Sequence, residues 1–227
     1  LIADLEARGA ADDRLESFLE GLRAVDCTVQ RLVRTDEHLV HPTMQHLERA
    51  LDDAIGPPAM LAATREISEA VQWYQIFQGG AIDSNLAEGL LAAQVVGSIG
   101  MLADEAVRCG VFLLAPGVHY PPHNHAASEI YYCLSGTLEL AYGLDAGSFE
   151  LRPGALCVTP PHRLHSLTTH DTPVLLIYIW IGLVDDPNWW WEKLAHGNWQ
   201  RNKWVRSADA FWQLADSEPV TADVLNE

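Results

Sequence analysis

Apolar residues recur at helical spacing through the first hundred residues of the chain. In residues 15–22 they occupy positions i, i+3, i+4 and i+7, which lie on one face of a helix. A similar stripe over residues 44–55 ends at Gly56-Pro57-Pro58, a strong stop signal. We expect helices over four segments: residues 15–22, 44–55, 67–74 and 86–96.

From about residue 111 the pattern changes to short runs rich in β-branched and aromatic residues, separated by Gly and Pro turns. Strands are expected at residues 111–114, 129–134, 137–142, 148–151, 155–159 and 174–181. Such spacing is typical of a β-sandwich or barrel. A Trp-rich segment follows at residues 188–191, and we expect a closing helix at 208–214. We therefore divide the chain into a helical region, residues 1–105, and a β-barrel, residues 106–227.

The segment of residues 117–136, GVHYPPHNHAASEIYYCLSG, combines His123-x-His125 with Glu129. Side chains of a strand alternate between its two faces, so odd-numbered residues of extended segments share a direction. Glu129, Tyr131 and Cys133 have the same parity as the two histidines. In a small barrel one of the two faces is the interior.

Imidazoles next to a carboxylate make a nitrogen and oxygen site of intermediate hardness. It suits iron(II), manganese, cobalt, nickel, copper or zinc better than calcium. A further ligand is expected from the later segment Pro160-Pro161-His162-Arg163-Leu164-His165. The alternative is that these histidines are merely hydrogen-bonded in the core.

Residues 117–136 resemble the first motif of the cupin superfamily, G(x)5HxH(x)3–4E(x)6G, with Gly117 and Gly136 at its ends. Residues 160–165 resemble the PxGxxH of the second motif, except that His162 replaces the glycine. The resemblance implies a double-stranded β-helix (jelly-roll) barrel preceded by helices, with one divalent transition metal per chain. It implies that the metal ligands are His123, His125, Glu129 and His165.

Tyr131 lies two residues after the Glu of the motif and shares its predicted face. A phenol beside a bound cation has a lowered pKa, which would suit a general base. The alternative is a core tyrosine with a hydrogen-bonded hydroxyl. The helical N-terminal part and the motif block together are similar to the cupin-type dimethylsulfoniopropionate (DMSP) lyases. That resemblance implies cleavage of DMSP to dimethyl sulfide and acrylate, with Tyr131 as base, Tyr120 nearby and a homodimer.

The substrate would then be a small zwitterion. The metal would bind its carboxylate, and a proton would leave the carbon next to that carboxylate. The sulfonium would contact an aromatic face through a cation–π interaction. Tyr120, Tyr178 and Trp180 are the candidates, although Tyr178 and Trp180 could equally be core residues.

Two other functions fit a cupin. A cupin dioxygenase would use the same ligands with iron(II) and would consume oxygen. A non-catalytic ligand-binding cupin would not need the full set of His and Glu ligands. Regulatory cupins would carry a basic DNA-binding region, whereas residues 1–60 hold 12 acidic and 6 basic residues.

The composition limits the classes of partner that we expect for this protein. The net charge is −17, from 31 acidic and 14 basic residues, which argues against nucleic acid and anionic membranes. The four cysteines form no CxxC pair and indicate reduced thiols in a cytoplasmic protein. No apolar run reaches the ~18 residues of a membrane helix. The first residue is Leu1, so a removed signal peptide stays an open alternative.

Overall fold

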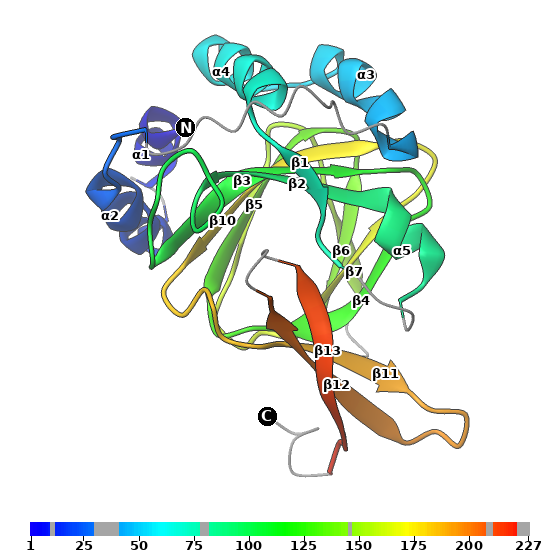
Figure 1. Cartoon of the computed structure of the whole chain (residues 1–227). Coiled ribbons are helices and arrows are strands. Elements are labelled where there is room, and N and C mark those ends of the chain that lie inside the picture. Colours follow the sequence, from blue (N-terminus) through cyan, green and yellow to red (C-terminus); the bar gives the residue numbers. More distant parts are fainter. Residues whose placement is uncertain (10–11, 30–40, 78–81, 145–146, 208–210, 222–227) are drawn as a thin grey trace.

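The computed structural model describes residues 1–9, 12–29, 41–77, 82–144, 147–207 and 211–221. Two antiparallel sheets face each other and form a jelly-roll barrel, with helices over one side (Figure 1). This confirms the predicted fold class: mainly β, with helices before the barrel.

The first sheet has the strand order β1-β2-β3-β10-β5-β8. Its members are β1 (Trp73–Gln75), β2 (Leu90–Val96), β3 (Val107–Leu114), β10 (Val174–Ile181), β5 (Ser128–Ser135) and β8 (Leu156–Thr159). The second sheet has the order β13-β12-β11-β4-β9-β6-β7. Its members are β13 (Trp212–Pro219), β12 (Trp199–Arg206), β11 (Asn188–Lys193), β4 (His119–Asn124), β9 (His165–Thr169), β6 (Leu138–Tyr142) and β7 (Ser148–Leu151).

The helices lie mostly on the outer face of the first sheet (Figure 1). They are α1 (Ile2–Gly9), α2 (Glu16–Ala24), α3 (Leu47–Asp52), α4 (Pro58–Ala70) and α5 (Ser84–Gly89), with 3-10 turns at Asp13–Leu15 and Pro42–His46. The predicted apolar stripe of residues 15–22 is the face that α2 buries, through Phe18, Leu19 and Leu22. Burial of this stripe attaches the helix to the barrel wall.

The alternation of β5 separates two apolar cores. Ile130, Tyr132 and Leu134 pack under the helices. Tyr131 and Cys133 point the other way, into the barrel. The strand is therefore buried on both faces, and its odd-numbered residues line the interior, as the parity argument predicts.

Three helix predictions are wrong in part. The segment of residues 86–96 is helical only to Gly89 and then becomes β2, which pairs with β3. The stripe of residues 67–74 stops being helical at Ala70, and Tyr74 belongs to β1. In the expected closing helix, residues 208–210 lie outside the described part, and Trp212 begins β13. Both N-terminal errors have one cause: β1 and β2 add to the barrel sheet, and tertiary pairing outweighs local helical spacing.

Strands β11, β12 and β13 form an antiparallel arm at the edge of the second sheet (Figure 1). Its inner end reaches the barrel, because β11 pairs with β4 through Trp190 and His123. The arm therefore brings residues from the end of the chain to the mouth of the barrel. Among the helices in the described ranges, none is long and apolar enough to cross a membrane.

Candidate metal centre

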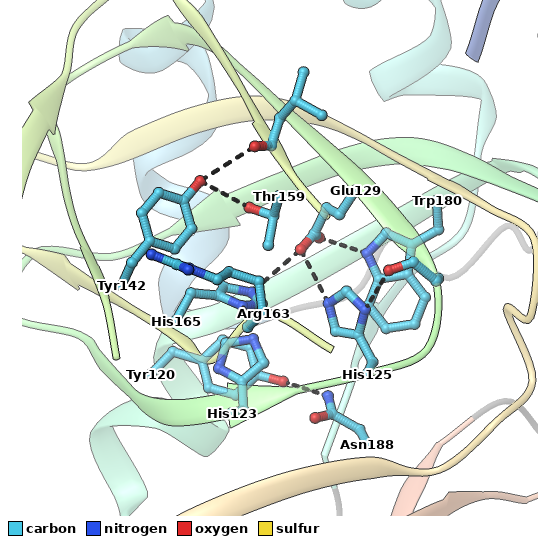
Figure 2. A network of polar contacts seen from close by, with 12 residues as sticks. Tyr120, His123, His125, Glu129, Tyr142, Thr159, Arg163, His165, Trp180 and Asn188 are labelled. Carbon is cyan, nitrogen blue, oxygen red and sulfur yellow. Dashed lines mark hydrogen bonds and ion pairs between the residues drawn. The ribbon is translucent and has the colours of Figure 1, made fainter. Parts of the chain in front are cut away.

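Four sequence-predicted ligands meet inside the barrel (Figure 2). His123 is on β4 and His125 follows directly after it, Glu129 is on β5, and His165 begins β9. β4 and β9 are paired with His123 opposite His165, which brings residues 42 positions apart onto one spot. All four side chains are buried.

Each histidine is oriented by a backbone carbonyl two residues away. His123 Nδ1 lies 2.8 Å from Pro121 O, His125 Nδ1 lies 3.0 Å from Ala127 O, and His165 Nδ1 lies 2.8 Å from Arg163 O. Only a protonated Nδ1 can donate to a carbonyl, so Nε2 of each neutral ring keeps its lone pair for other partners. The three histidines place ligand atoms within 4.8 Å of one another.

Glu129 joins this group through both carboxylate oxygens. Its Oε2 lies 3.1 Å from His125 Nε2 and 3.3 Å from His165 Nε2, and its Oε1 accepts a 2.5 Å hydrogen bond from Trp180 Nε1. Burial alone would raise the pKa of Glu129, but its close contacts with the two histidines outweigh burial and lower the pKa. Glu129 is therefore a carboxylate at neutral pH.

The donor set fits a divalent cation. Burial lowers the pKa of His123 and of His125, so both rings stay neutral, and Nε2 of His125 faces the anionic Glu129 Oε2. His165 Nε2 is buried and finds no hydrogen-bond partner within the described residues. Buried acceptors that face each other need a positive partner between them. The three-histidine group can hold a metal ion, and its nitrogen-rich chemistry matches the transition metals expected from the sequence.

At the departure from the second cupin motif, a residue with a side chain takes a backbone conformation that favours glycine. His162 adopts a left-handed backbone conformation, with φ of 62°, at the position where the motif has glycine. Its backbone N–H donates to His125 O over 2.7 Å. The turn that delivers His165 is thus tied to the first motif even though a side chain occupies the glycine position.

The four aromatic residues expected around the site line one cavity beside the histidines. Tyr120 stacks on His123, with ring centroids 3.7 Å apart and planes at 8°, and its hydroxyl accepts from Asn188 Nδ2 over 2.9 Å. Tyr178 stacks on Phe112, with centroids 4.1 Å apart. The cavity volume is about 30 Å³. That is room for one or two water molecules, so a larger ligand must displace side chains on entering.

Tyr131 and Trp180 are both neighbours of Glu129: Tyr131 lies two residues further along β5, and Trp180 is opposite Glu129 on β10. Tyr131 has its ring centroid 6.3 Å from that of His165. Trp180 covers His125, with centroids 4.0 Å apart, while its N–H holds Glu129. Sequence reasoning assigned Trp180 only a sulfonium contact and missed its hydrogen bond to the carboxylate.

In the protein without a bound cation, the pKa values of Tyr131 and Tyr120 are both raised. Burial first, and then the charge of Glu129, raise the pKa of Tyr131 well above its ordinary value. Burial likewise raises the pKa of Tyr120, although the hydrogen bond from Asn188 acts against it. A phenolate at this site therefore requires an additional positive charge.

Several cavity residues carry no recognisable motif and were not predicted. They are Phe112 on β3, Asn188 on β11, Arg108 on β3, Arg206 on β12 and Trp212 on β13. They come from four strands, and β3 lies far from the other three in the sequence, so only the fold brings them together. The one available signal was the Trp-rich segment, whose Trp190 contacts the ring of Tyr120 at 5.4 Å between centroids.

Residues 15–176 match the family model of the dimethylsulfoniopropionate lyases. The chain belongs to this family. DMSP lyase DddQ from Ruegeria pomeroyi is 27% identical over 111 residues, which cover 49% of this chain and 55% of that protein. The chain thus spans about half the length of the curated relative that it matches.

Solved structures agree on the fold of this DMSP lyase family member. The crystal structure of DMSP lyase DddQ from Ruegeria pomeroyi superposes with a TM-score of 0.61 at 23% identity, covering 82% of this chain and 94% of that one. A chain from the crystal structures of the DMSP lyases RdDddP and RnDddQII gives a TM-score of 0.60 at 20% identity, with the same coverage. The family expected from the two motifs and the helical N-terminal part is confirmed.

Proposed function

We propose that this protein cleaves dimethylsulfoniopropionate to dimethyl sulfide and acrylate by β-elimination at a metal centre in the barrel. Membership of the DMSP lyase family supports the substrate. The carrying observation is the convergence of three oriented histidine nitrogens and the Glu129 carboxylate beside a cavity lined by tyrosines.

The proposed ligands are His123, His125, Glu129 and His165, holding one divalent iron, zinc, manganese, cobalt or nickel ion. When bound, such an ion supplies Lewis acidity toward a substrate carboxylate and positive charge that favours phenolate over phenol. The hydrogen bonds from the ring Nδ1 atoms to Pro121, Ala127 and Arg163 preserve the required tautomers. The carbonyls of one strand residue, Pro121, and of two loop residues, Ala127 and Arg163, thus fix the direction of the ligands.

Tyr131 is the proposed base. As phenolate it removes a proton from the carbon next to the substrate carboxylate, and that C–H electron pair forms the new C=C bond of acrylate. The C–S bond breaks, and its electron pair leaves on sulfur, which turns the sulfonium into neutral dimethyl sulfide. The proton resides on the Tyr131 hydroxyl and passes to solvent before the next turnover.

Tyr120 is the other tyrosine at the centre, and we propose that it positions rather than deprotonates the substrate. Its ring is stacked flat on His123, and its hydroxyl already accepts a hydrogen bond from Asn188. These two contacts hold the ring in one place. Tyr131 lies on β5 of the first sheet, two residues after Glu129, and points into the barrel.

Aromatic rings offer the sulfonium a binding surface. Trp180 is committed to His125 and Glu129, whereas Tyr178 and Phe112 form a stacked pair at the cavity wall. A cation against such a face gains about 0.5–2 kcal/mol. We propose that Tyr178 contributes more to sulfonium binding than Trp180 does.

Gas chromatography of the headspace above metal-loaded protein and DMSP tests the function when the reaction runs without oxygen. Equal amounts of dimethyl sulfide and acrylate are expected, with metal and DMSP without protein as the control. Oxygen-dependent consumption of the substrate would point to a dioxygenase instead. Complete absence of volatile sulfide from metal-loaded protein would refute the lyase proposal.

A further inference from the structure

Arg206 brings an unsatisfied positive charge to the cavity. It is the last residue of β12 and lies in the cavity wall with Tyr120, Tyr178 and Trp212. Its guanidinium carbon lies 4.8 Å from the centre of the Trp212 ring. Its Nε and Nη1 atoms are buried and have no hydrogen-bond partner anywhere in the described part of the chain.

The second arginine of the cavity wall provides a contrast. Arg108 Nη2 donates to both carboxylate oxygens of Asp185, at 2.9 and 3.0 Å, and Nη1 donates to the backbone oxygens of Asp104 and Val107. Its charge is therefore neutralised by an acidic partner. Arg206, in contrast, forms no ion pair with any other described residue.

No acidic side chain of the cavity wall is free to neutralise Arg206. Among the described residues that line the cavity, Glu129 is the one carboxylate. It is already engaged by His125, His165 and Trp180. Leaving the buried N–H groups of a cation without an acceptor costs more free energy than losing an ordinary hydrogen bond. Within the described part of the chain, the buried N–H groups of Arg206 thus remain open to an anion.

We propose that Arg206 binds the carboxylate of the substrate. The inference rests on the proposed function for the identity of the substrate, but the recognition of a small monocarboxylate rests on Arg206 itself. Guanidinium groups form strong, directional hydrogen bonds with carboxylates, more so than neutral donors do. Arg206 is a positioning and specificity residue, because it selects a ligand with a negative end and orients that end toward the metal centre.

This assignment gives the C-terminal arm a role in the site. The charge of Arg206 reaches several phenols of the cavity. Burial raises the pKa of Tyr178 well above its ordinary value, and the nearby Tyr74 adds to this, while Arg206 acts against the rise. The arm therefore supplies both positive charge and the Trp212 face to a cavity that is also lined by His123 of β4 and Glu129 of β5.

Isothermal titration calorimetry on the metal-loaded full chain distinguishes carboxylate recognition by Arg206 from a purely structural role of this side chain. Two probes are used: acrylate, which carries only the carboxylate, and ethyldimethylsulfonium, which carries only the cation. The variant is Arg206→Met, with Arg206→Lys to retain the charge. Arg201→Met is the matched control, because Arg201 lies on the same strand and stacks on Trp189 at 4.4 Å, away from the cavity.

We expect Arg206→Met to weaken acrylate binding about 10- to 100-fold. Ethyldimethylsulfonium binding should stay within about twofold, Arg206→Lys should recover part of the loss, and Arg201→Met should bind both probes as the original chain does. Equal acrylate affinity in Arg206→Met and the original chain would overturn the inference. An equal loss of both probes would also overturn it, since the side chain would then only shape the cavity. Neither result depends on dimethyl sulfide release, which tests the lyase proposal separately.

Discussion

Trp180 and Glu129 occupy directly opposed positions on the paired strands β10 and β5, and the indole N–H of Trp180 donates to Glu129 Oε1 over 2.5 Å. The other oxygen of the same carboxylate faces His125 and His165. The Trp180 hydrogen bond therefore holds one oxygen of Glu129 while the other faces the centre. Trp180 of β10 thus orients the Glu129 carboxylate of β5 through this hydrogen bond.

Trp180→Phe should weaken metal binding about 10- to 100-fold, because Glu129 then loses the donor that orients it. Metal affinity measured by competition with a chelator tests this. Trp190→Phe is the control, since Trp190 is a buried cavity neighbour whose indole N–H makes no hydrogen bond to any described residue. Equal metal affinities in the two variants would show that the Trp180 hydrogen bond does not support the site.

Tyr131→Phe should reduce turnover of DMSP by at least about 100-fold, because a general base contributes that much or more. Its metal content should stay at the level of the original chain. Tyr132→Phe is the matched control: Tyr132 is the next residue of β5, faces the helices, and its hydroxyl accepts from Arg8 instead. Full activity of the Tyr131 variant would make Tyr131 dispensable and direct attention to Tyr120.

The candidate site was predictable largely because its motif encodes geometry locally. The period of two in β4 and β5 predicted one shared face for His123, His125, Glu129 and Tyr131; in the structure His123 and His125 place ligand atoms within 4.8 Å of each other, and Glu129 lies against His125. The position of His165 followed from the second motif. The expected homodimer and cytoplasmic location stay predictions.

The remainder of the site depends on pairing between distant strands, which one sequence does not encode in a readable way. β2 was predicted as helix because Leu90–Val96 is buried on both faces, under helices and over the barrel, and so shows no alternation. Arg206 and Asn188 belong to strands whose pairing partners could not be inferred. Their contribution to the cavity emerges only from the assembled second sheet.

His162 tests whether the second motif needs glycine. Its φ of 62° lies in the left-handed region, which is costly for side chains that branch at Cβ and free for glycine. His162→Val should lower the free energy of unfolding by about 1–2 kcal/mol relative to His162→Gly. Urea denaturation of both metal-free variants measures the difference. Equal stabilities would mean that the turn relaxes to another conformation.

The metal-free protein should lose stability as the pH falls from about 7.5 to 5.5. Burial lowers the pKa of His123 and His125 in the folded state. In the unfolded chain these rings take up protons near pH 6.5. Below that pH the unfolded state binds more protons than the folded state. The free energy of unfolding therefore falls by at most about 1.4 kcal/mol per pH unit for each histidine.

The pKa of Glu129 is lowered from its ordinary value, so the effect of this group on stability falls at more acidic pH. It does not overlap the range between pH 7.5 and 5.5. The free energy of unfolding, measured by denaturant titration at each pH, tests the slope. A stability that is flat between pH 7.5 and 5.5 would contradict the neutral, buried state of the two rings.

The central claim is that His123, His125, Glu129 and His165 hold one ion that the elimination requires. The most direct test adds each candidate divalent metal stepwise to stripped protein, without oxygen, and measures the initial rate of dimethyl sulfide release at every step. The account predicts a rate that rises with bound metal and saturates at about one ion per chain, and a His165→Ala variant that stays inactive throughout. Dimethyl sulfide release that is independent of added metal, or protein that never binds any of these ions, would contradict it.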